Sequence, residues 1–345
     1  MENNKCKNCG ATYKFDPATC TLKCVKCGSE ILLPTDSSFR MHDIDMKAPI
    51  LDDGYMSGPV HLKCMNCGSE FESTESSIAV TCAYCGSNVV QNLDVDKRKP
   101  DGVIPFGFSV EDAKTKFFDG LKKKSFLPNK FKNGNVNLEV DSIYVPAFKF
   151  TCKTVNNYNG KIYEDYEDSE KNKHREYRHI SGTLSTTTDN ILIECSEFLD
   201  QKTLNAIRPF NLNQCYKYDE SFIMGYSVEF YNRKMAEIRD IAVKHVERDV
   251  RSKILSRYHY DGVSYLDIDT TYESSGYAHL ILPTYRVKYK YGKKSYYTFM
   301  NGQTGKVGRN LPRSGVKILF FVLGILGIIG AIVGAIVAAA VKNSL

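Results

Sequence analysis

Residues 6–28 have the sequence CKNCGATYKFDPATCTLKCVKCG, in which two Cys-x-x-Cys pairs are separated by fourteen residues. Each pair aims two thiolates at one point, and the glycine that follows it accepts the left-handed backbone that such a turn requires. Two of these turns, joined by a short hairpin, complete a tetrahedral site for one metal ion. The pattern predicts a zinc ribbon over residues 1–33, called ribbon 1, with the ligands Cys6, Cys9, Cys24 and Cys27.

The same pattern recurs 58 positions later, which indicates an internal duplication. It predicts a second ribbon over residues 61–91, called ribbon 2, with the ligands Cys64, Cys67, Cys82 and Cys85. The segment 34–60 between the two is rich in proline, glycine, aspartate and serine, so we expect a linker there. A ribbon of about 30 residues buries too little core to fold alone, and we expect one Zn²⁺ in each ribbon to fold it.

A four-cysteine site leaves no position open for water or substrate, so a structural zinc is expected rather than a hydrolytic one. Iron at the same ligands, or a redox-active thiol pair, is the alternative. The first residues contain no apolar segment, so we expect no cleavable signal peptide and a reducing compartment, where such pairs bind metal. Cys20 has no counterpart in ribbon 2 and is expected to be a small packed residue, and the dispersed Cys152, Cys195 and Cys215 are expected to be buried thiols.

Near the other end, residues 318–341 form an apolar stretch of 24 residues, ILFFVLGILGIIGAIVGAIVAAAV. As a helix it is about 36 Å long, enough to cross a hydrocarbon core of about 30 Å. A buried core helix is the alternative, although apolar runs of this length are rare in soluble proteins. Arg309, Arg313 and Lys317 precede the span, and only Lys342 follows it. The positive-inside rule then predicts a tail-anchored, single-pass protein of the cell membrane whose N-terminal domains are cytoplasmic.

The sequence around the span suggests two further contacts. Nine basic residues and no acidic one lie in the segment 286–317. Such a segment is attracted to anionic lipid headgroups by about 1 kcal/mol per charge near the surface, but a topology signal beside a soluble strand explains it equally well. Within the span, Gly330-x-x-x-Gly334 predicts self-association of the helix, unless its small residues serve no partner at all.

Nucleic-acid binding rests on cationic surface, and the ribbons supply little of it. Ribbon 1 has a net charge of +2 and ribbon 2 of −2, and four thiolates around one Zn²⁺ add about −2 to each. The segment 97–132, with ten basic and four acidic residues, is either a surface for an anionic partner or a solvated helix face. We therefore expect an unknown protein partner or a structural role rather than nucleic-acid binding.

Between the ribbons and the span we expect a linker at 92–102 and one α+β domain at 103–312. The capping pair Ser109 and Asp112 predicts a helix over 110–124, and apolar residues at spacings of three and four predict another over 235–254, capped by Asn232. Strands are expected at 142–155, 179–185, 190–195, 265–271, 277–291 and 293–300, with a polar loop at 156–173, a hairpin at Gly292 and a tight turn at 301–305. The predicted fold class is α+β, with two N-terminal ribbons and one C-terminal transmembrane helix.

The sequence contains no catalytic signature. Residues 302–307, GQTGKV, lack the spacing and the Ser or Thr of a phosphate loop, and no metalloprotease, nucleophile-elbow or dinucleotide-binding motif occurs. The seven histidines are scattered along the chain. We therefore do not expect an enzyme, and no catalytic residue or organic cofactor is assigned.

Several stretches outside the cysteine pairs are distinctive: 104–106 (IPF), 143–146 (IYVP), 282–285 (LPTY), and above all 299–307 (FMNGQTGKV) followed by 311–312 (LP) and the span. With the Cys-x-x-Cys-Gly pairs, their order resembles a family of bacterial membrane proteins described as containing transcription-factor-IIB-type zinc ribbons. Members are sometimes labelled primosomal helicase-like. The resemblance covers most of the chain apart from the duplicated ribbon and some loops. It implies zinc binding by the eight cysteines and no established activity, and the helicase label has no support because the chain lacks a phosphate loop.

Together these features predict a membrane-anchored zinc-binding protein that acts as a non-enzymatic protein-interaction or scaffold module at the cytoplasmic face. One alternative is a membrane-tethered protein that binds nucleic acid through ribbon 1 and the segment 97–132. Another is a thiol redox sensor, which would release zinc and form disulfides under mild oxidant.

Overall fold

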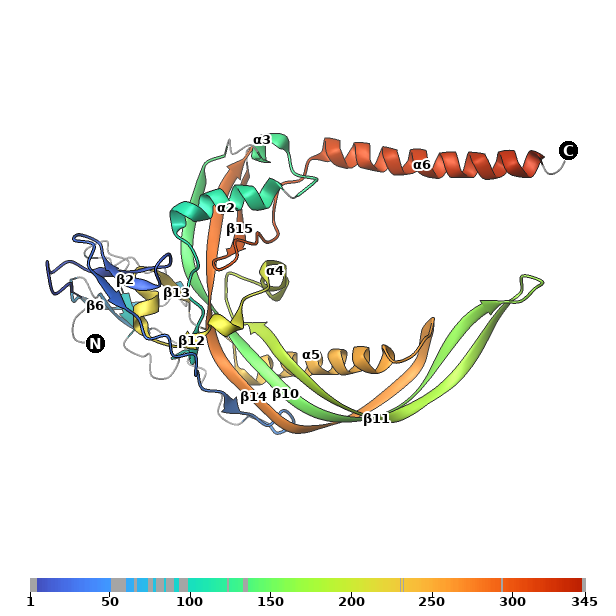
Figure 1. Cartoon of the computed structure of the whole chain (residues 1–345), viewed down its shortest axis with the longest axis horizontal. Helices are drawn as coiled ribbons and strands as arrows, with labels where there is room; N and C mark the ends of the chain where they lie inside the picture. The colour runs from blue at the N-terminus through green and yellow to red at the C-terminus, as the bar shows by residue number, and fades with distance from the viewer. Residues whose placement is uncertain are drawn as a thin grey trace.

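The protein is built on a long, curved antiparallel sheet, shown in the computed structural model of Figure 1. The structure describes residues 5–50, 60–64, 67–73, 77–78, 84, 90–92, 99–122, 124–132, 136–229, 231, 233–292 and 294–342. The main strands, in spatial order, are β11 (Lys173–Glu194), β10 (Leu138–Glu167), β14 (Gly262–Tyr291) and β15 (Lys294–Asn301). The hairpin between β14 and β15 turns at Gly292 as predicted, where φ is +62°.

The far part of the sheet extends as an arm, defined here as residues 156–182 with 262–272. Strands β10 and β11 pair as far as Glu167 and Lys173, and in the turn the Asp168 carboxylate accepts hydrogen bonds from the backbone N–H of Glu170 and Asn172 (2.9 Å each). Register shifts interrupt the pairing at three places along β10. Such bulges bend a sheet, which agrees with the curvature in Figure 1.

The polar loop predicted at 156–173 is wrong, because only residues 168–172 separate the two strands. Asn156 and Gly160 occupy inward positions of β10, where apolar residues would have marked a strand. Asn156 is fully buried, and hydrogen bonds satisfy both ends of its amide. Its Nδ2 donates to the Leu184 carbonyl oxygen (2.9 Å), and its Oδ1 accepts from the Thr270 hydroxyl (2.9 Å). A Cβ at Gly160 would lie 2.8 Å from the Tyr265 carbonyl oxygen, so the close approach of β14 requires glycine.

Helix α5 (Met235–Leu255) packs on the concave side of the sheet (Figure 1). Its buried residues Ile238, Ala242, Val246, Val250 and Ile254 recur every four positions and form one apolar cluster with the sheet. This confirms the predicted helix and its apolar face. The N-cap position is Lys234, with no side-chain cap bond, and the predicted cap Asn232 lies outside the described residues.

Helices α2 (Val110–Lys122) and α3 (Asn129–Lys132) cover the other end of the sheet. The Ser109 hydroxyl accepts a hydrogen bond from the Asp112 N–H (3.1 Å), which confirms the predicted cap. Phe117 and Phe131 are fully buried against the end of β14. The structure is therefore anchored at this end by aromatic packing.

The distinctive stretch 299–307 forms the predicted tight turn after β15. The Asn301 side chain is fully buried; its Nδ2 donates to the carbonyl oxygens of Ile207 (3.0 Å) and Pro209 (2.9 Å), and its Oδ1 accepts from the Gln303 N–H (2.8 Å). A Cβ at Gly302 would lie 2.6 Å from the Phe106 ring, so glycine is required for this close approach. The turn thus packs the end of β15 against Phe106 and against residues 207–209 in the described structure.

Short elements complete the fold. They are β1 (Tyr13–Asp16), β2 (Thr21–Cys24), β3 (Glu30–Leu32), β4 (His42–Asp43), β5 (Val60–Cys64), β6 (Glu70–Ser73), β7 (Ser77–Ile78), β8 (Val90–Asn92), β9 (Gly102–Val103), α4 (Gln201–Ile207), β12 (Tyr216–Lys217) and β13 (Ser227–Glu229), with 3₁₀ turns η1 (Leu212–Gln214) and η2 (Glu220–Ile223). Ribbon 1 forms the sheet β1-β2-β3, and β6-β5-β8 forms a second three-stranded sheet. Strand β4, within the predicted linker 34–60, pairs with β14, and β7, within the range of ribbon 2, pairs with β13.

Helix α6 (Gly315–Lys342) leaves the end of the fold that carries α2 and α3 (Figure 1). Its segment Gly315–Ala335 has a mean hydropathy of 2.8 and none of it is buried, so it is long and apolar enough to cross a membrane. A Cβ at Gly330 or Gly334 would meet nothing within 4 Å, so self-association through these glycines stays a prediction. The mixed α+β class with a C-terminal apolar helix is confirmed.

Candidate metal centre

The four cysteines predicted for ribbon 1 lie together in the structure. The sulfur atoms of Cys6, Cys9, Cys24 and Cys27 are all within 4.8 Å of one another, and the Cys6–Cys27 and Cys9–Cys24 sulfur pairs are 3.5 Å apart. A disulfide would bring two sulfurs to about 2.05 Å. Four sulfurs at about 2.3 Å from a central ion are about 3.8 Å apart in a regular tetrahedron. The cluster therefore fits a four-coordinate metal ion bound by thiolates.

The backbone of each Cys-x-x-Cys turn is preorganised in the way the sequence predicts. The Gly10 N–H donates to the Cys6 carbonyl oxygen (2.8 Å), and the Gly28 N–H donates to that of Cys24 (3.1 Å). The φ angles of these glycines, +71° and +73°, are left-handed. A side chain at either position would be strained, so the glycines belong to the site.

Ser29 is a residue of the site that the spacing of the cysteines does not identify. Its Oγ lies 3.1 Å from the Cys6 sulfur and 3.3 Å from the Cys27 sulfur. This hydroxyl, together with that of Tyr13, lowers the pKa of Cys6 to about 5, and Ser29 also lowers the pKa of Cys27. The sequence does contain a signal for this serine, because Cys-Gly-Ser occurs at 27–29, 67–69 and 85–87.

The ionisation of Cys6, Cys9 and Cys27 depends on the sulfur atoms beside them. At Cys9 the Ala11 backbone N–H favours the thiolate, but burial and the neighbouring sulfurs outweigh it, and the pKa of Cys9 is raised to about 11. Thiolates at this separation repel one another, so a second and third deprotonation become progressively harder. A divalent cation in the centre removes that penalty, which makes binding of metal and loss of protons one coupled event.

Half of the second predicted site is described, and it repeats the same turn. The Gly68 N–H donates to the Cys64 carbonyl oxygen (2.8 Å), and φ at Gly68 is +78°. The Ser69 hydroxyl lies 3.1 Å from the Cys67 sulfur, as Ser29 does beside Cys27. Cys82 and Cys85 lie outside the described residues, so the second cluster of four is not shown.

Ribbon 1 shares its core with the body, meaning the main sheet with α2–α5. Phe15 of β1 is 1% exposed, and its ring packs on Phe222 (centroids 5.6 Å apart) and Tyr226 (6.1 Å). The Phe15 N–H also donates to the Met224 carbonyl oxygen (3.0 Å). One apolar cluster contains ribbon residues, two metal-site cysteines and the aromatic residues of the body. The cysteine cluster of ribbon 1 therefore adjoins a packing surface of the body.

Four further cysteines of the described residues lie apart from the ribbon-1 cluster and from the Cys64–Cys67 turn. Cys20 is half-buried in the turn between β1 and β2 with a left-handed φ of +55°. Cys152, Cys195 and Cys215 are buried, as predicted, and burial raises the pKa of Cys215 to about 12. These thiols are protonated at neutral pH, which agrees with a packing role.

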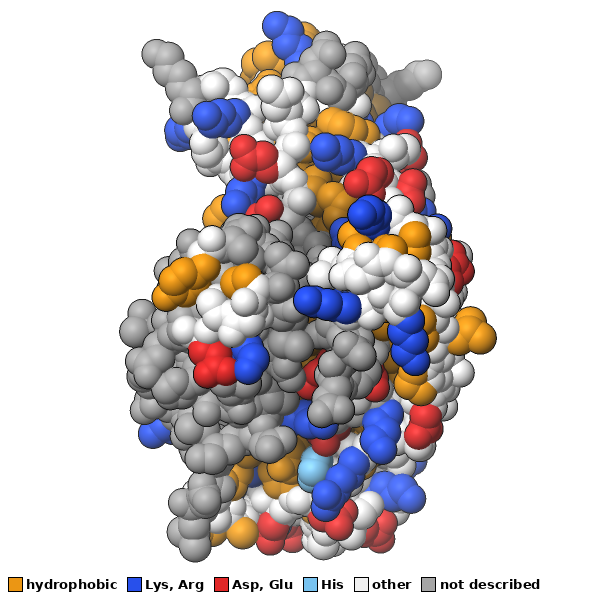
Figure 2. Space-filling view, turned by 90° about the vertical axis from the view of Figure 1, so that its left-hand side faces the viewer, with side chains coloured by type: hydrophobic (Ala, Val, Ile, Leu, Met, Phe, Trp, Pro, Cys, Tyr) orange, Lys and Arg blue, Asp and Glu red, His pale blue; other side chains and the backbone are white. Residues whose placement is uncertain are grey.

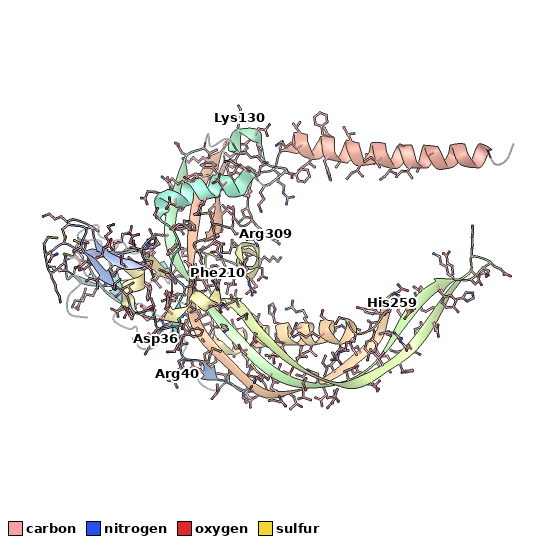
Figure 3. The ribbon with its side chains drawn as sticks, in the orientation of Figure 1. Asp36, Arg40, Lys130, Phe210, His259 and Arg309 are labelled. Atoms are coloured by element: carbon pink, nitrogen blue, oxygen red, sulfur yellow. The ribbon has the colours of Figure 1, made fainter. Side chains whose placement is uncertain are left out.

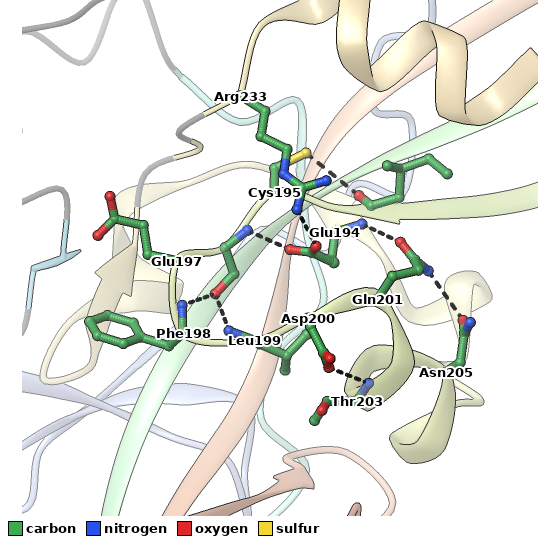
Figure 4. A network of polar contacts seen from close by, with 12 residues as sticks. Glu194, Cys195, Glu197, Phe198, Leu199, Asp200, Gln201, Thr203, Asn205 and Arg233 are labelled. Atoms are coloured by element: carbon green, nitrogen blue, oxygen red, sulfur yellow. Dashed lines mark hydrogen bonds and ion pairs between the residues drawn. The ribbon is translucent and has the colours of Figure 1, made fainter.

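A buried polar network, which contains titratable groups, lies at the end of β11 in the body (Figure 4). Glu194 is 2% exposed and pairs with Arg233 at 2.8 Å between Oε1 and Nη2. Glu229 is 1% exposed; it accepts hydrogen bonds from the Ser196 hydroxyl (2.6 Å) and the Glu197 N–H. Because Ser196 donates to Glu194 through its N–H and to Glu229 through its hydroxyl, the network holds the β11–α4 connection in place.

Burial makes the stability of the fold depend on the charge of Glu229, whose pKa is raised from 4.5 to about 7. Between these values the folded state keeps a proton that the unfolded state has lost, so the contribution of Glu229 to the free energy of unfolding falls as pH rises. Above pH 7 the loss is complete at about 3 kcal/mol. Burial lowers the pKa of His279 from 6.5 to about 4, so the contribution of His279 to the free energy of unfolding rises with pH between these values. The effect of Glu229 is therefore measured as the difference in unfolding free energy between a variant and the unchanged protein.

We therefore expect the free energy of unfolding of Glu229→Gln, relative to that of the unchanged protein, to increase by about 3 kcal/mol between about pH 5 and about pH 8. A glutamine has the same shape and can still accept a hydrogen bond from the Glu197 N–H, so most of the packing is kept. Denaturant unfolding at several pH values measures the difference, with Glu176→Gln, an exposed glutamate in the outer part of β11, as the matched control. A constant difference across this range would mean that Glu229 stays ionised in the fold.

Comparison with known proteins identifies one relative of similar length and no activity. No protein-family model matches the chain, and no solved structure matches it. The chain is 25% identical over 334 residues, covering 94% of both sequences, to the uncharacterized protein YdjG of Bacillus subtilis (strain 168).

Proposed function

We propose that this protein is a membrane-anchored zinc-binding protein that holds a protein-interaction surface at the cytoplasmic face of the membrane, without enzymatic activity. One observation carries the proposal: a closed cluster of four cysteines lies in a ribbon that packs on the body of a chain with one unburied apolar helix. We also propose that the chain belongs to the family of bacterial membrane proteins with transcription-factor-IIB-type zinc ribbons.

The metal is proposed to be Zn²⁺, one ion in each ribbon. Four thiolates in a tetrahedral arrangement favour Zn²⁺, and a site filled by four protein ligands keeps no position for a substrate. When bound, the ion would neutralise the thiolates and fold the ribbon. The cytoplasmic orientation is supported by the three basic residues that precede the span against one that follows it.

The surface of ribbon 1 favours a protein partner over nucleic acid. Lys23 faces two carboxylates, Asp16 (3.8 Å) and Glu30 (3.4 Å), so its charge is offset. In contrast, two apolar side chains, Val25 and Leu32, are 64% and 86% exposed. Figure 2 views the side of the molecule on which ribbon 1 lies, and there the basic side chains of the described residues are scattered among acidic and uncharged ones.

A photo-crosslinking residue in place of Leu32 tests this proposal in cells that express the full chain. We expect an adduct of higher mass that protease removes and nuclease does not. The matched control is the same residue in place of Tyr297, which is 50% exposed but lies on β15 of the body, and there we expect no adduct. An adduct sensitive to nuclease would instead favour the nucleic-acid function, and equal labelling at both positions would contradict a specific surface on ribbon 1.

A further inference from the structure

The first turn of α6 is held against the loop between α2 and α3. The Lys317 Nζ donates to the Leu127 carbonyl oxygen (2.8 Å), and the Ser314 N–H donates to the Phe126 carbonyl oxygen (2.8 Å). The Phe126 and Phe321 rings pack edge to face with their centroids 5.2 Å apart. This loop therefore lies where the chain enters its apolar span.

Exposed lysines lie on the α2–α3 loop and α3, beside the base of α6, and on the β14–β15 hairpin that packs on α3. We call Lys124, Lys130, Lys290 and Lys294 the basal lysines. Phe131 of α3 packs on Tyr289 (4.8 Å) and Tyr291 (5.8 Å), so α3 and the β14–β15 hairpin form one surface. Figure 3 shows Lys130 at the end of the fold from which α6 leaves.

The basal lysines have no acidic neighbour in sequence to offset them. The segments 120–137 and 286–317 contain no Asp or Glu. Within the part of the chain that the structure describes, no ion pair involves any of the four. Arg286 and Lys288 are not counted with them, because both pair with Asp141 at 3.0 Å.

We propose that the basal lysines and Phe126 bind the anionic phospholipid headgroups of the bilayer that α6 spans, and that this contact sets how the body stands on the membrane. The proposal rests on the membrane anchoring proposed above and adds the lipid class and the surface. Because α6 keeps this surface beside the bilayer, the headgroups are present at a high effective concentration. Each lysine near an anionic surface raises the affinity about fivefold, and the 38% exposed ring of Phe126 suits the interface.

The arm restricts how α6 stands in a bilayer. Figure 1 shows α6 and the arm extending in the same direction. The tip of the arm carries ionised side chains, among them Asp165 and Arg175, paired at 2.6 Å, and such groups are excluded from hydrocarbon. In a bilayer α6 therefore leans away from the arm and rises from the end that carries α3 and the β14–β15 hairpin. The basal lysines then face the headgroups while the arm lies in water.

The chain contains no tryptophan, so Phe126→Trp creates a single fluorescent reporter. The full chain is reconstituted in vesicles of brominated phosphatidylcholine with increasing fractions of phosphatidylglycerol. We expect quenching of this tryptophan to rise with the anionic fraction and to weaken at high salt. Adding Lys124→Gln and Lys130→Gln should raise the anionic fraction at half-maximal quenching at least about twofold.

Tyr166→Trp is the matched control, because Tyr166 is 52% exposed at the tip of the arm, and no quenching is expected there. Equal quenching of the Phe126→Trp reporter with and without phosphatidylglycerol would overturn the lipid contact. Quenching of the Tyr166→Trp reporter would overturn the inferred orientation, and relief of quenching by an oligonucleotide at about 150 mM salt would assign the surface to nucleic acid. Flotation with the vesicles is measured on the same samples, and a chain that does not float would contradict the membrane anchor itself.

Discussion

Cys24→Ser is expected to remove the metal from ribbon 1 and to unfold that ribbon in the full chain. Cys24 is 3% exposed and its sulfur lies 3.5 Å from that of Cys9, inside the cluster of four. Structural zinc contributes about 10–16 kcal/mol to the folding of zinc-finger peptides. A small ribbon has no comparable core of its own, so loss of one ligand is not compensated.

Because ribbon 1 shares its core with the body, the effect of Cys24→Ser should extend beyond the ribbon. We expect zinc to fall from two ions per chain to one, protease to cut within ribbon 1, and the body to melt several degrees lower. Metal analysis, limited proteolysis and thermal unfolding of the detergent-solubilised full chain measure these three results.

Cys20→Ser is the matched control, since it makes the same chemical change in the same ribbon at a cysteine outside the cluster. It should keep both zinc ions and resist protease as the unchanged chain does. Retention of two zinc ions by Cys24→Ser would contradict the ligand assignment. Loss of zinc from Cys20→Ser would show that another set of cysteines holds the ion.

Phe15→Ala is expected to destabilise the protein by about 3–5 kcal/mol while leaving zinc in place. The Phe15 ring is fully enclosed between ribbon 1 and the body, against Phe222 and Tyr226, and its removal leaves a cavity at that boundary. The four cysteines are not touched, so the metal content should not change. Denaturant unfolding together with metal analysis separates loss of packing from loss of the ion.

Val25→Ala serves as the control for Phe15→Ala, because Val25 lies in the same ribbon but is 64% exposed. Its cost should stay within about 0.5 kcal/mol. If Phe15→Ala costs no more than Val25→Ala, ribbon 1 does not form part of the core and moves independently of the body.

The first metal cluster could be predicted from sequence because its geometry is local. All four ligands lie within residues 6–27, and each Cys-x-x-Cys-Gly turn fixes its own backbone through a hydrogen bond between residues four apart. The packing of Phe15 on Phe222 could not be predicted in this way. It joins residues about two hundred positions apart, and nothing in the pattern of either segment identifies the other.

The arm illustrates a second limit. Its strands alternate inward and outward, but Asn156 and Gly160 fill inward positions, so the apolar period that marks a strand is interrupted. Asn156 is tolerated there only because β11 and β14 satisfy its amide. The apolar span of α6 is evident from composition alone. The contact of its first turn with the α2–α3 loop could not be predicted, because it joins Lys317 and Leu127, which are 190 positions apart.

Metal analysis of the full chain, purified in detergent without added metal, decides whether the two ribbons are zinc sites. We expect two zinc ions per chain, and we expect a chelator to remove both and to unfold ribbon 1. Iron in place of zinc, or a fully folded chain without metal, would contradict this expectation.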